Sequence, residues 1–309
     1  MPSLRGERLR LRVRSARGFA AQFSRRPAGV IGVLVLVVFT ILAIAPDLFV
    51  GPLQDVTTAT GDHLASPSFA EPLGTDSLGR SVLNLTVWGT RVSMVIGFLA
   101  TIVTILVGVI VGIVAGYTGG AVDAVLMRIT DLFLVLPTFV LALILAPIIL
   151  SIVGSDAEVA GIRVTLIVIV VVIGLTSWAS TARVIRSQVL SLKERAFVDR
   201  ARVIGAGGLH IMRRHLLPNV MNLIIANTVL TFAGAVLTET TLSFIGLGDP
   251  FQPSWGQILN DAQTVGAPSL GAWWWVLGPA ASIVLVVLAF TLVGNALDDI
   301  LNPRLRVRR

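Results

Sequence analysis

RAFVDRARVIGAGGLHIMRRHLLPN, residues 195–219, is a basic segment that glycines interrupt between two apolar runs. We expect a short helix over 193–204, which Gly205 ends by adopting a left-handed conformation. A second amphipathic helix over 209–216 then leads to Pro218. Such a helix-glycine-helix knob suits a surface that another protein holds. The alternative is an ordinary solvated basic loop.

The composition is that of a membrane protein. Of 309 residues, 55% are hydrophobic and 13% are charged, and the mean hydropathy is +0.88. A soluble domain has about 25% charged residues. Cysteine is absent, which excludes disulfides and thiolate metal sites.

Six apolar runs are long enough to cross a bilayer, which takes about 20 residues. They cover residues 28–48, 92–117, 129–152, 164–182, 220–245 and 274–293. The fifth run is the weakest because Asn222, Asn227 and Glu239 lie inside it. We predict an all-α integral membrane protein with six transmembrane helices.

The basic residues indicate the topology. If both termini are cytoplasmic, only Arg80, Arg91 and Arg163 of the 24 Lys and Arg residues face outward. This is the asymmetry that the positive-inside rule describes. Because the charge follows every cytoplasmic segment, nucleic-acid binding is excluded. We expect the first apolar run to remain as an anchor and the Arg-rich tail before it to lie on anionic lipid.

The chain divides into three expected parts. Residues 1–88 hold the N-terminal tail, the anchor helix and an extracytoplasmic loop, 89–297 a compact unit of five spans, and 298–309 a basic cytoplasmic C-terminal tail. The proline-containing loop 46–88 is too long for a simple hairpin, so it should be ordered by packing. Its stretch 77–90 has apolar residues at helical spacing, which predicts an interfacial helix.

Small residues and prolines mark two of the runs. Gly108, Gly112 and Gly116 recur at four-residue spacing, which lets helix backbones approach closely. Packing inside one bundle is favoured over a dedicated dimer face. Pro137 and Pro147 can kink the third run, although packing alone would also account for them.

The sequence argues against catalysis by this chain. The only lysine, Lys193, follows Leu192, so no GxxxxGK[ST] phosphate loop exists and any ATP hydrolysis must come from another chain. His63, His210 and His215 are too scattered for a two-histidine metal pair on one helix, because a five-residue spacing puts the last two on different helix faces. No GxSxG nucleophile motif is present. We expect neither enzyme activity nor a bound cofactor or metal.

Two charged positions near membrane spans are candidates for function. Glu239 lies toward the outer end of the fifth run, where an ionised carboxylate is costly. It either lines the translocation path or outer gate, or it hydrogen-bonds to Thr238, Thr240 or a neighbouring helix end. Arg128 and Asp131, three residues apart, are more simply a local ion pair.

The segment quoted first resembles the EAA loop of ATP-binding-cassette importer permeases. That pattern reads Glu-Ala-Ala, three residues, Gly, nine residues, then Ile-x-Leu-Pro. The matching positions, which the resemblance assigns to coupling with an ATPase, are Asp199, Arg200, Ala201, Gly205, His215, Leu217 and Pro218. Asp for Glu and Arg for Ala depart from it, so the match depends on the glycine, the Leu-Pro end and the spacing.

Further motifs make the resemblance more specific and extend it over nearly the whole chain. They are FSRRPAGVIG (23–32), PLGTDSLGRSVLN (72–84), LSFIGLGDP (242–250), SWGQIL (254–259), GAWWWVLGP (271–279) and NALDDILNPRLR (295–306). Together they resemble the C-type permease of the dipeptide/oligopeptide/nickel importers. The resemblance implies a type I importer permease fold in a prokaryotic plasma membrane.

The resemblance also implies an assembly. The partners would be a B-type permease, two ATPase subunits that bind ATP and Mg, an extracytoplasmic solute-binding protein and membrane lipid. The binding protein would dock on the outer loops 46–88 and 246–272, and ATPase closure would drive alternating access through the loop around 199–205. Substrate would pass between the two permeases, with peptides as the expected cargo.

Alternative functions stay open on the sequence alone. Within transport, the cargo could be nickel, haem or glutathione, because the binding protein usually sets selectivity. A self-contained secondary transporter or channel would show internal repeats and paired intramembrane charges. A membrane scaffold would use the basic loop only to bind lipid.

Overall fold

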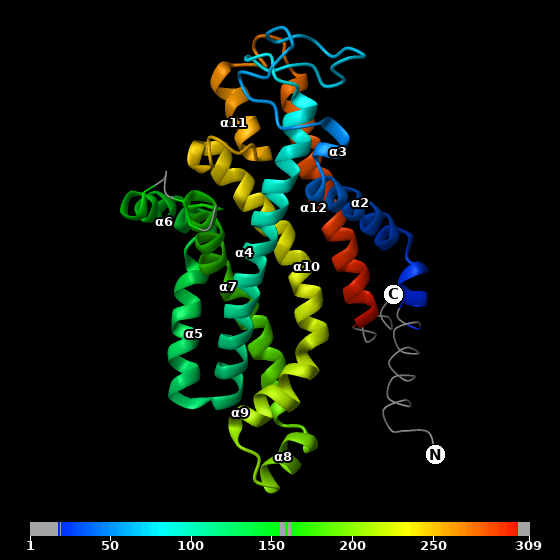
Figure 1. Ribbon diagram of the computed structural model, residues 1–309. Helices are drawn as coiled ribbons and strands as arrows, with labels where there is room; N and C mark the ends of the chain where they lie inside the picture. The colour runs from blue at the N-terminus through cyan, green and yellow to red at the C-terminus, as the bar shows by residue number, and fades with distance from the viewer. Residues whose placement is uncertain (1–17, 19, 155–157, 160–161, 302–309) are drawn as a thin grey trace.

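The structure is a computed structural model that describes residues 18, 20–154, 158–159 and 162–301. Long helices dominate it (Figure 1). The long elements are α2 (Pro27–Ile44), α4 (Val82–Thr118), α5 (Gly120–Val135), α6 (Thr138–Val153), α7 (Val164–Lys193), α10 (Leu217–Leu242) and α12 (Trp274–Leu301).

Shorter elements connect the long helices. They are α3 (Asp47–Val50), β1 (Glu158–Val159), β2 (Ile162–Arg163), α8 (Ala196–Val203), α9 (Gly208–Ile211), the π-helix η1 (Met212–Leu216), the π-helix η2 (Ser243–Leu247) and α11 (Trp255–Val265). The two strands are two residues each and pair antiparallel. The architecture of the described residues is therefore all-α apart from this small hairpin.

The prediction of six spans is confirmed in its count. Among the described residues, five helices are long and apolar enough to cross a membrane, and a bent helix pair makes up to six. The five are α2, α4, α7, α12 and the continuous helix Gly208–Leu247, which runs through α10. The expected orientation of the termini remains a prediction.

The third apolar run forms part of a bent pair of helices. Helices α5 and α6 meet at 91°, so the expected single helix over 129–152 is wrong. Leu136 has ψ 128°, the extended backbone that a residue before proline favours, and Pro137 follows it with φ −57°. Pro147, by contrast, lies inside α6, and the helix continues through it. Figure 1 shows α5 alongside α4 and α7, with α6 crossing near the start of α7.

Helix α4 begins earlier than the sequence indicated. It starts at Val82 and runs for 37 residues, so the expected separate interfacial helix over 77–90 is wrong. Val82 and Leu85 are buried against α11 and α12 rather than lying on a lipid surface. At 1.5 Å per residue α4 is about 55 Å long, which exceeds the thickness of a bilayer. Its first turns therefore support the structure outside the spans.

The close packing of α4 on α7 explains the glycine ladder. A Cβ atom at Gly112 would lie 2.6 Å from the carbonyl oxygen of Ala182 and 2.9 Å from Cβ of Ile185. A Cβ atom at Gly108 would lie 2.7 Å from Cβ of Thr181, and one at Gly116 would lie 2.8 Å from Cβ of Val189. The expectation of packing within the bundle is confirmed.

At one end of the bundle lies a cap, formed by residues 51–81, α11 and residues 266–273 (Figure 1). Leu53, Leu64 and Leu73 of the loop pack on a cluster that contains Trp274 and Trp275. The loop is thus ordered by packing, as expected. Its largest apolar anchors come from the GAWWW motif at the start of α12.

Candidate functional site

Helix α8, the turn 204–207 and α9 form a knob at the end of the bundle opposite the cap (Figure 1). Gly205 has φ +88°, in the left-handed region that favours glycine. The N–H of Ala206 donates to the carbonyl oxygen of Ala201 at 2.9 Å, and the N–H of Gly205 to that of Arg202 at 2.9 Å. These two bonds are the Schellman pattern that ends a helix. The predicted glycine stop at Gly205 is confirmed.

The first helix of the knob is shorter than expected. Helix α7 continues to Lys193, and α8 begins only at Ala196. The expected helix over 193–204 is therefore wrong at its start, because the chain turns at Glu194 and Arg195 between two helices. Only 24 residues, 194–217, separate α7 from Pro218, so the knob is a short connection between two spans.

The base of the knob is buried in the bundle. Val198 and Ala201 of α8 pack in one cluster with residues of α7 and the helix that contains α10. The buried members from the long helices are Val109, Ile113, Ile185, Val189, Leu192, Ile211, Leu216, Val220 and Ile224. Close-packed protein interiors transmit a displacement of one element to its neighbours. A force on α8 would therefore reach α4, α7 and α10 together.

The tip of the knob is apolar and exposed. Val203 and Ile204 are 87% and 84% exposed, directly before Gly205. A Cβ atom at Gly205 would meet no atom within 4 Å, so the surface around it is open. Two large apolar side chains on an exposed turn are a surface to which another molecule can bind. Val203 and Ile204 were not among the residues predicted from the sequence, although an apolar pair before the helix-ending glycine was the signal.

Charged side chains flank this tip. Asp199 accepts from Nη1 of Arg202 at 3.2 Å, and both side chains are largely exposed. The guanidinium of Arg202 also lies 5.8 Å from the ring centre of Tyr117, at the end of α4. Arg200 is exposed. The structure therefore places Asp199 and Arg200 at the solvent, where a partner could contact them.

The second half of the segment differs from the expected separate helix over 209–216. Helix α9 passes into the π-helix η1 and then into α10 without interruption. His215 lies in η1, half-buried, and its ring centre is 6.3 Å from that of Phe197 in α8. Leu217 is half-buried and Pro218 is exposed in the first turn of α10, where proline is tolerated.

The π-helix also corrects the expected position of two histidines. His210 and His215 share a face, with ring centres 5.8 Å apart, because a π-turn brings residues i and i+5 together. The expectation of different faces assumed α-helical geometry and is wrong. Within the described residues, no group of three or more His, Asp or Glu side chains could hold a metal ion.

Glu239 occupies a second candidate position, inside α10. Its side chain is fully buried, and the Ser243 hydroxyl donates to Oε1 at 2.9 Å. The Thr240 hydroxyl is 3.4 Å from Oε2, and Ser93 and Ser254 also hydrogen-bond to the carboxyl. Ser254 caps the N-terminus of α11 by accepting from the N–H of Gln257 at 3.2 Å. Glu239 therefore joins α10 to α4 and α11.

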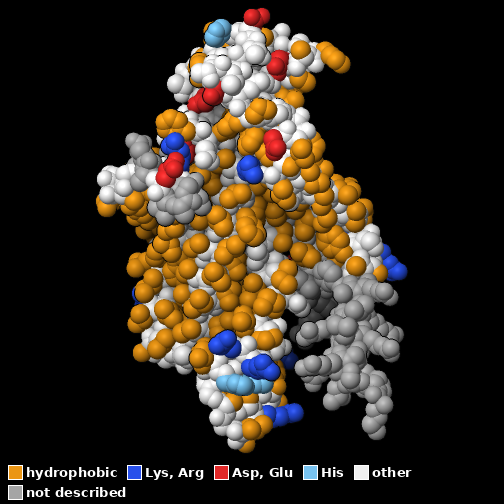
Figure 2. Space-filling model, viewed as in Figure 1, with side chains coloured by type: hydrophobic (Ala, Val, Ile, Leu, Met, Phe, Trp, Pro, Cys, Tyr) orange, Lys and Arg blue, Asp and Glu red, His pale blue; other side chains and the backbone are white. Residues whose placement is uncertain are grey.

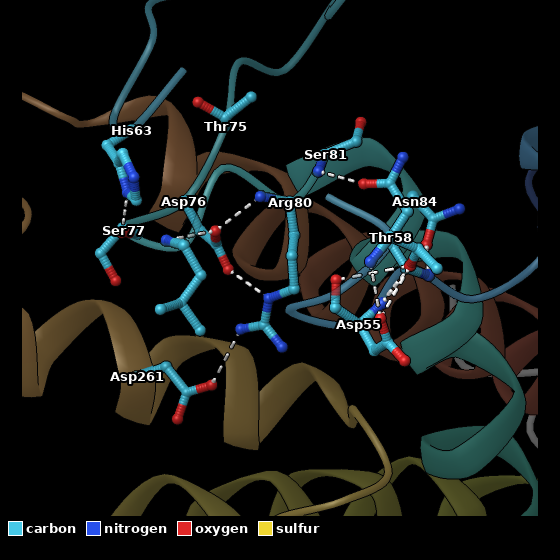
Figure 3. Close-up of polar contacts among 12 residues, drawn as sticks. Asp55, Thr58, His63, Thr75, Asp76, Ser77, Arg80, Ser81, Asn84 and Asp261 are labelled. Carbon is cyan, nitrogen blue, oxygen red and sulfur yellow. Dashed lines mark hydrogen bonds and ion pairs between the residues drawn. The ribbon is translucent and has the colours of Figure 1, made fainter. Parts of the chain in front are cut away.

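The cap is held by a polar network (Figure 3). Asp76 is buried and accepts from the backbone N–H groups of Leu78 and Arg80, both at 2.8 Å, and from Nε of Arg80 at 2.7 Å. Nη2 of Arg80 reaches Asp261 of α11 at 4.0 Å. Trp274 donates through Nε1 to the carbonyl oxygen of Thr75 at 3.2 Å. The PLGTDSLGR motif is thus the segment that fastens the loop to α11 and α12.

A second part of the network fixes the start of the loop. Asn84 of α4 donates to the carbonyl oxygens of Val50 and Pro52, both at 2.9 Å, and accepts from the N–H of Gln54 at 3.1 Å. Nearby, hydrogen bonds from the hydroxyl of Thr57 and from Thr58 lower the pKa of Asp55 to about 2. The cap is therefore a preformed surface.

A bundle of apolar spans with a knob at one end and a rigid cap at the other defines a multi-pass membrane protein that presents a surface at each end. The family model described as the binding-protein-dependent transport system inner membrane component matches residues 108–307. The chain belongs to this family.

Relatives named for transport match most of the chain. The dipeptide transport system permease protein of Bacillus subtilis (strain 168) is 36% identical over 277 residues, which cover 88% of this chain and 80% of that protein. The oligopeptide transport system permease protein of the same strain is 31% identical over 287 residues, 92% and 88% of the two chains. The dipeptide transport system permease protein of Alkalihalophilus pseudofirmus is 33% identical over 288 residues, again 92% and 88%.

Proposed function

We propose that this chain is a permease subunit of an ATP-driven importer and forms half of a membrane pathway for peptides. The names of the relatives, dipeptide and oligopeptide permeases, support the cargo class. The proposed site is a prokaryotic plasma membrane, with both termini and the knob in the cytoplasm and the cap outside. Nickel, haem or glutathione is the alternative cargo within the same type of assembly.

The observation that best supports coupling is the construction of the knob. Its tip, with Val203, Ile204 and Gly205, is exposed, whereas Val198 and Ala201 on the same helix are buried against the spans. ATP and Mg would bind to two partner ATPase chains. Closure of these ATPases would push on the tip, and the buried base would pass the motion to α7 and α10.

The cap supplies the other surface that the proposal needs. A solute-binding protein would dock on it, and a B-type permease would complete the pathway beside this chain. The network around Asp76 and Asn84 holds the cap on α4, α11 and α12. Docking on the cap would therefore displace the helices that begin in it. Ligand delivery and ATPase closure would then act on opposite ends of the same helices.

Substitution of Gly205 tests the coupling. Gly205→Asp places a side chain at φ +88° and a charge on the apolar tip, so we expect uptake and substrate-stimulated ATPase activity to be lost while membrane insertion is kept. Gly207→Ala is the matched control, since Gly207 lies in the same turn with φ −67° and open space around it. Normal substrate-stimulated ATPase activity in Gly205→Asp would contradict the proposal.

Purification tests the assembly. The tagged chain, extracted from its native membrane in mild detergent, should bring with it a second permease and P-loop ATPases that mass spectrometry identifies. Recovery of a stable oligomer of this chain alone would instead favour a channel or secondary transporter. Uptake of labelled dipeptides, competed with nickel, haem or glutathione, then decides between the cargo classes.

A further inference from the structure

A cationic pocket lies where α9 of the knob passes into η1. It has a volume of about 530 Å³ and is lined by Leu209, His210, Arg213 and Arg214. The two arginines are in η1, the π-turn that leads into α10. Figure 2 shows cationic and histidine side chains gathered at the lower end of the apolar surface.

The two arginines lack acidic partners within the part of the chain that the structure describes. No carboxylate there lies within 4.0 Å of Arg213 or Arg214. By contrast, Arg183, Arg186 and Arg202 each pair with an aspartate. Adjacent cations without an internal counter-charge attract an anion from outside.

An apolar groove adjoins this pocket. It has a volume of about 190 Å³ and shares Leu209 and Arg213 with the cationic pocket. Its other lining residues come from the last turns of α4, from η1 and from the start of α10, and they are Val109, Ile110, Ile113, Val114, Met212 and Leu217. Ile110 is 61% exposed. A hydrocarbon chain in this groove would cover apolar side chains that lie open on the single chain.

The geometry points to a binding site for an anionic phospholipid, with the phosphate at Arg213 and Arg214 and an acyl chain in the groove along α4. We propose this from the continuity of the two cavities, because an amphiphile is the ligand that fits a cationic pocket joined to an apolar groove. Arginine suits the site because its stem lies on apolar surface while its guanidinium reaches the headgroup. Basic pockets between membrane helices are suited to anionic headgroups.

The position of the groove favours a lipid over a soluble protein as the occupant of this site. It runs along α4 and the start of α10, both parts of apolar helices that can span a membrane. A soluble ATPase would contact the tip at Val203 and Ile204, which lines neither cavity. The bound lipid would hold η1, and through it the connection between the knob and α10.

Lipid counting by native mass spectrometry tests the proposal. The full chain, delipidated in mild detergent, is mixed with phosphatidylglycerol or with phosphatidylcholine of the same acyl chains. Wild type should retain phosphatidylglycerol in preference. Each near-surface cation strengthens binding to anionic lipid about fivefold, so Arg213→Gln/Arg214→Gln should lower the retention of phosphatidylglycerol by about 30-fold. Arg128→Gln/Arg195→Gln removes two exposed charges elsewhere and should change it little.

Further arms identify the occupant. Ile110→Gln should weaken retention of phosphatidylglycerol while both arginines remain, which supports the acyl-chain part of the site. Equal retention of the two lipids, or equal loss in the Arg128/Arg195 control, would overturn the site. Displacement of phosphatidylglycerol by millimolar inorganic phosphate would assign the pocket to a free anion. Unchanged lipid binding with loss of co-purifying ATPase in the Arg213/Arg214 variant would assign it to a protein contact.

Discussion

Arg186 donates two hydrogen bonds to Asp123, from Nε to Oδ1 and from Nη2 to Oδ2, and both are 2.6 Å long. This bidentate pair connects α7 to α5, the first helix of the bent pair. The side chains are 29% and 17% exposed, so water screens the pair only in part. Such paired geometry is among the stronger polar contacts in proteins.

We expect Asp123→Asn to lower the free energy of unfolding by about 1–3 kcal/mol, because it leaves a partly buried guanidinium without its carboxylate. Thermal unfolding of the purified chain in detergent measures this. Asp131→Asn is the control: its pair with Arg183 joins the same two helices, but the side chains are 49% and 57% exposed. A surface pair contributes about 0–1 kcal/mol, so equal losses in the two variants would contradict the argument.

The same two aspartates show what sequence spacing could not reveal. Asp131 was expected to pair with Arg128, three residues away, and that is wrong because its partner is Arg183, 52 residues away. Spacing along one helix indicates which groups can meet locally, whereas the partner on a neighbouring helix depends on how the helices pack. The spans themselves were predictable because their apolar runs reflect the hydrocarbon thickness alone.

Of the backbone features, one was predictable from the sequence and two were not. The stop at Gly205 was predictable because only glycine readily adopts a positive φ. The 91° break needed more than Pro137, since Pro147 is accommodated within α6. The π-turn at Met212–Leu216, which brings His210 and His215 together, has no simple signal in the spacing of residues.

The contact of α4 with α7 gives a second prediction. At Gly112 a methyl group would meet the carbonyl oxygen of Ala182 at 2.6 Å, and backbone cannot move aside as a flexible side chain can. We expect Gly112→Ala to lower the free energy of unfolding by about 1–3 kcal/mol through overpacking. Thermal unfolding in detergent is again the measurement.

Gly234→Ala is the matched control for that helix glycine. Gly234 lies within α10, and a Cβ atom there would meet nothing within 4 Å. Alanine in open helical positions stabilises by about 0.5–1 kcal/mol, so this variant should unfold at the same or a higher temperature. Destabilisation of the same size at both positions would show that the close approach at Gly112 is not the cause.

Asp261 of α11 gives a prediction on pH. Burial raises the pKa of this carboxyl above 3.8, against the hydrogen bond from Gln257 and the charge of Arg80. A raised folded pKa means that the contribution of Asp261 to stability is present below pH 3.8 and is lost as the pH rises through the raised value. Asp261→Asn keeps an acceptor for Gln257 Nε2 but does not ionise.

We therefore expect the stability of Asp261→Asn relative to wild type to increase as the pH rises above 3.8. Hydrogen exchange of the α11 amides across that range is the measurement, since it reports on the cap rather than on the whole bundle. Gln257→Ala removes an interaction that favours the charged form, so it should make the loss with rising pH larger. Parallel pH profiles for wild type and Asp261→Asn would disprove the assignment.

Glu239 gives the last prediction, because its structural and transport roles can be separated by two variants. Glu239→Gln keeps a carbonyl acceptor for the Ser243 hydroxyl, so it should insert and unfold close to wild type. Glu239→Ala leaves the hydroxyl groups of Ser93, Ser243 and Ser254 without this acceptor inside the protein and should cost about 1–3 kcal/mol.

Transport by the Gln variant then decides the role. If Glu239 only joins α10 to α4 and α11, Glu239→Gln should retain uptake while Glu239→Ala loses uptake and stability together. If the carboxyl group acts in the pathway or outer gate, Glu239→Gln should unfold like wild type and yet lose most of its uptake, because the amide cannot ionise. The buried hydrogen bonds in this conformation favour the first outcome, since four hydroxyl groups from three segments of the chain already surround the carboxyl.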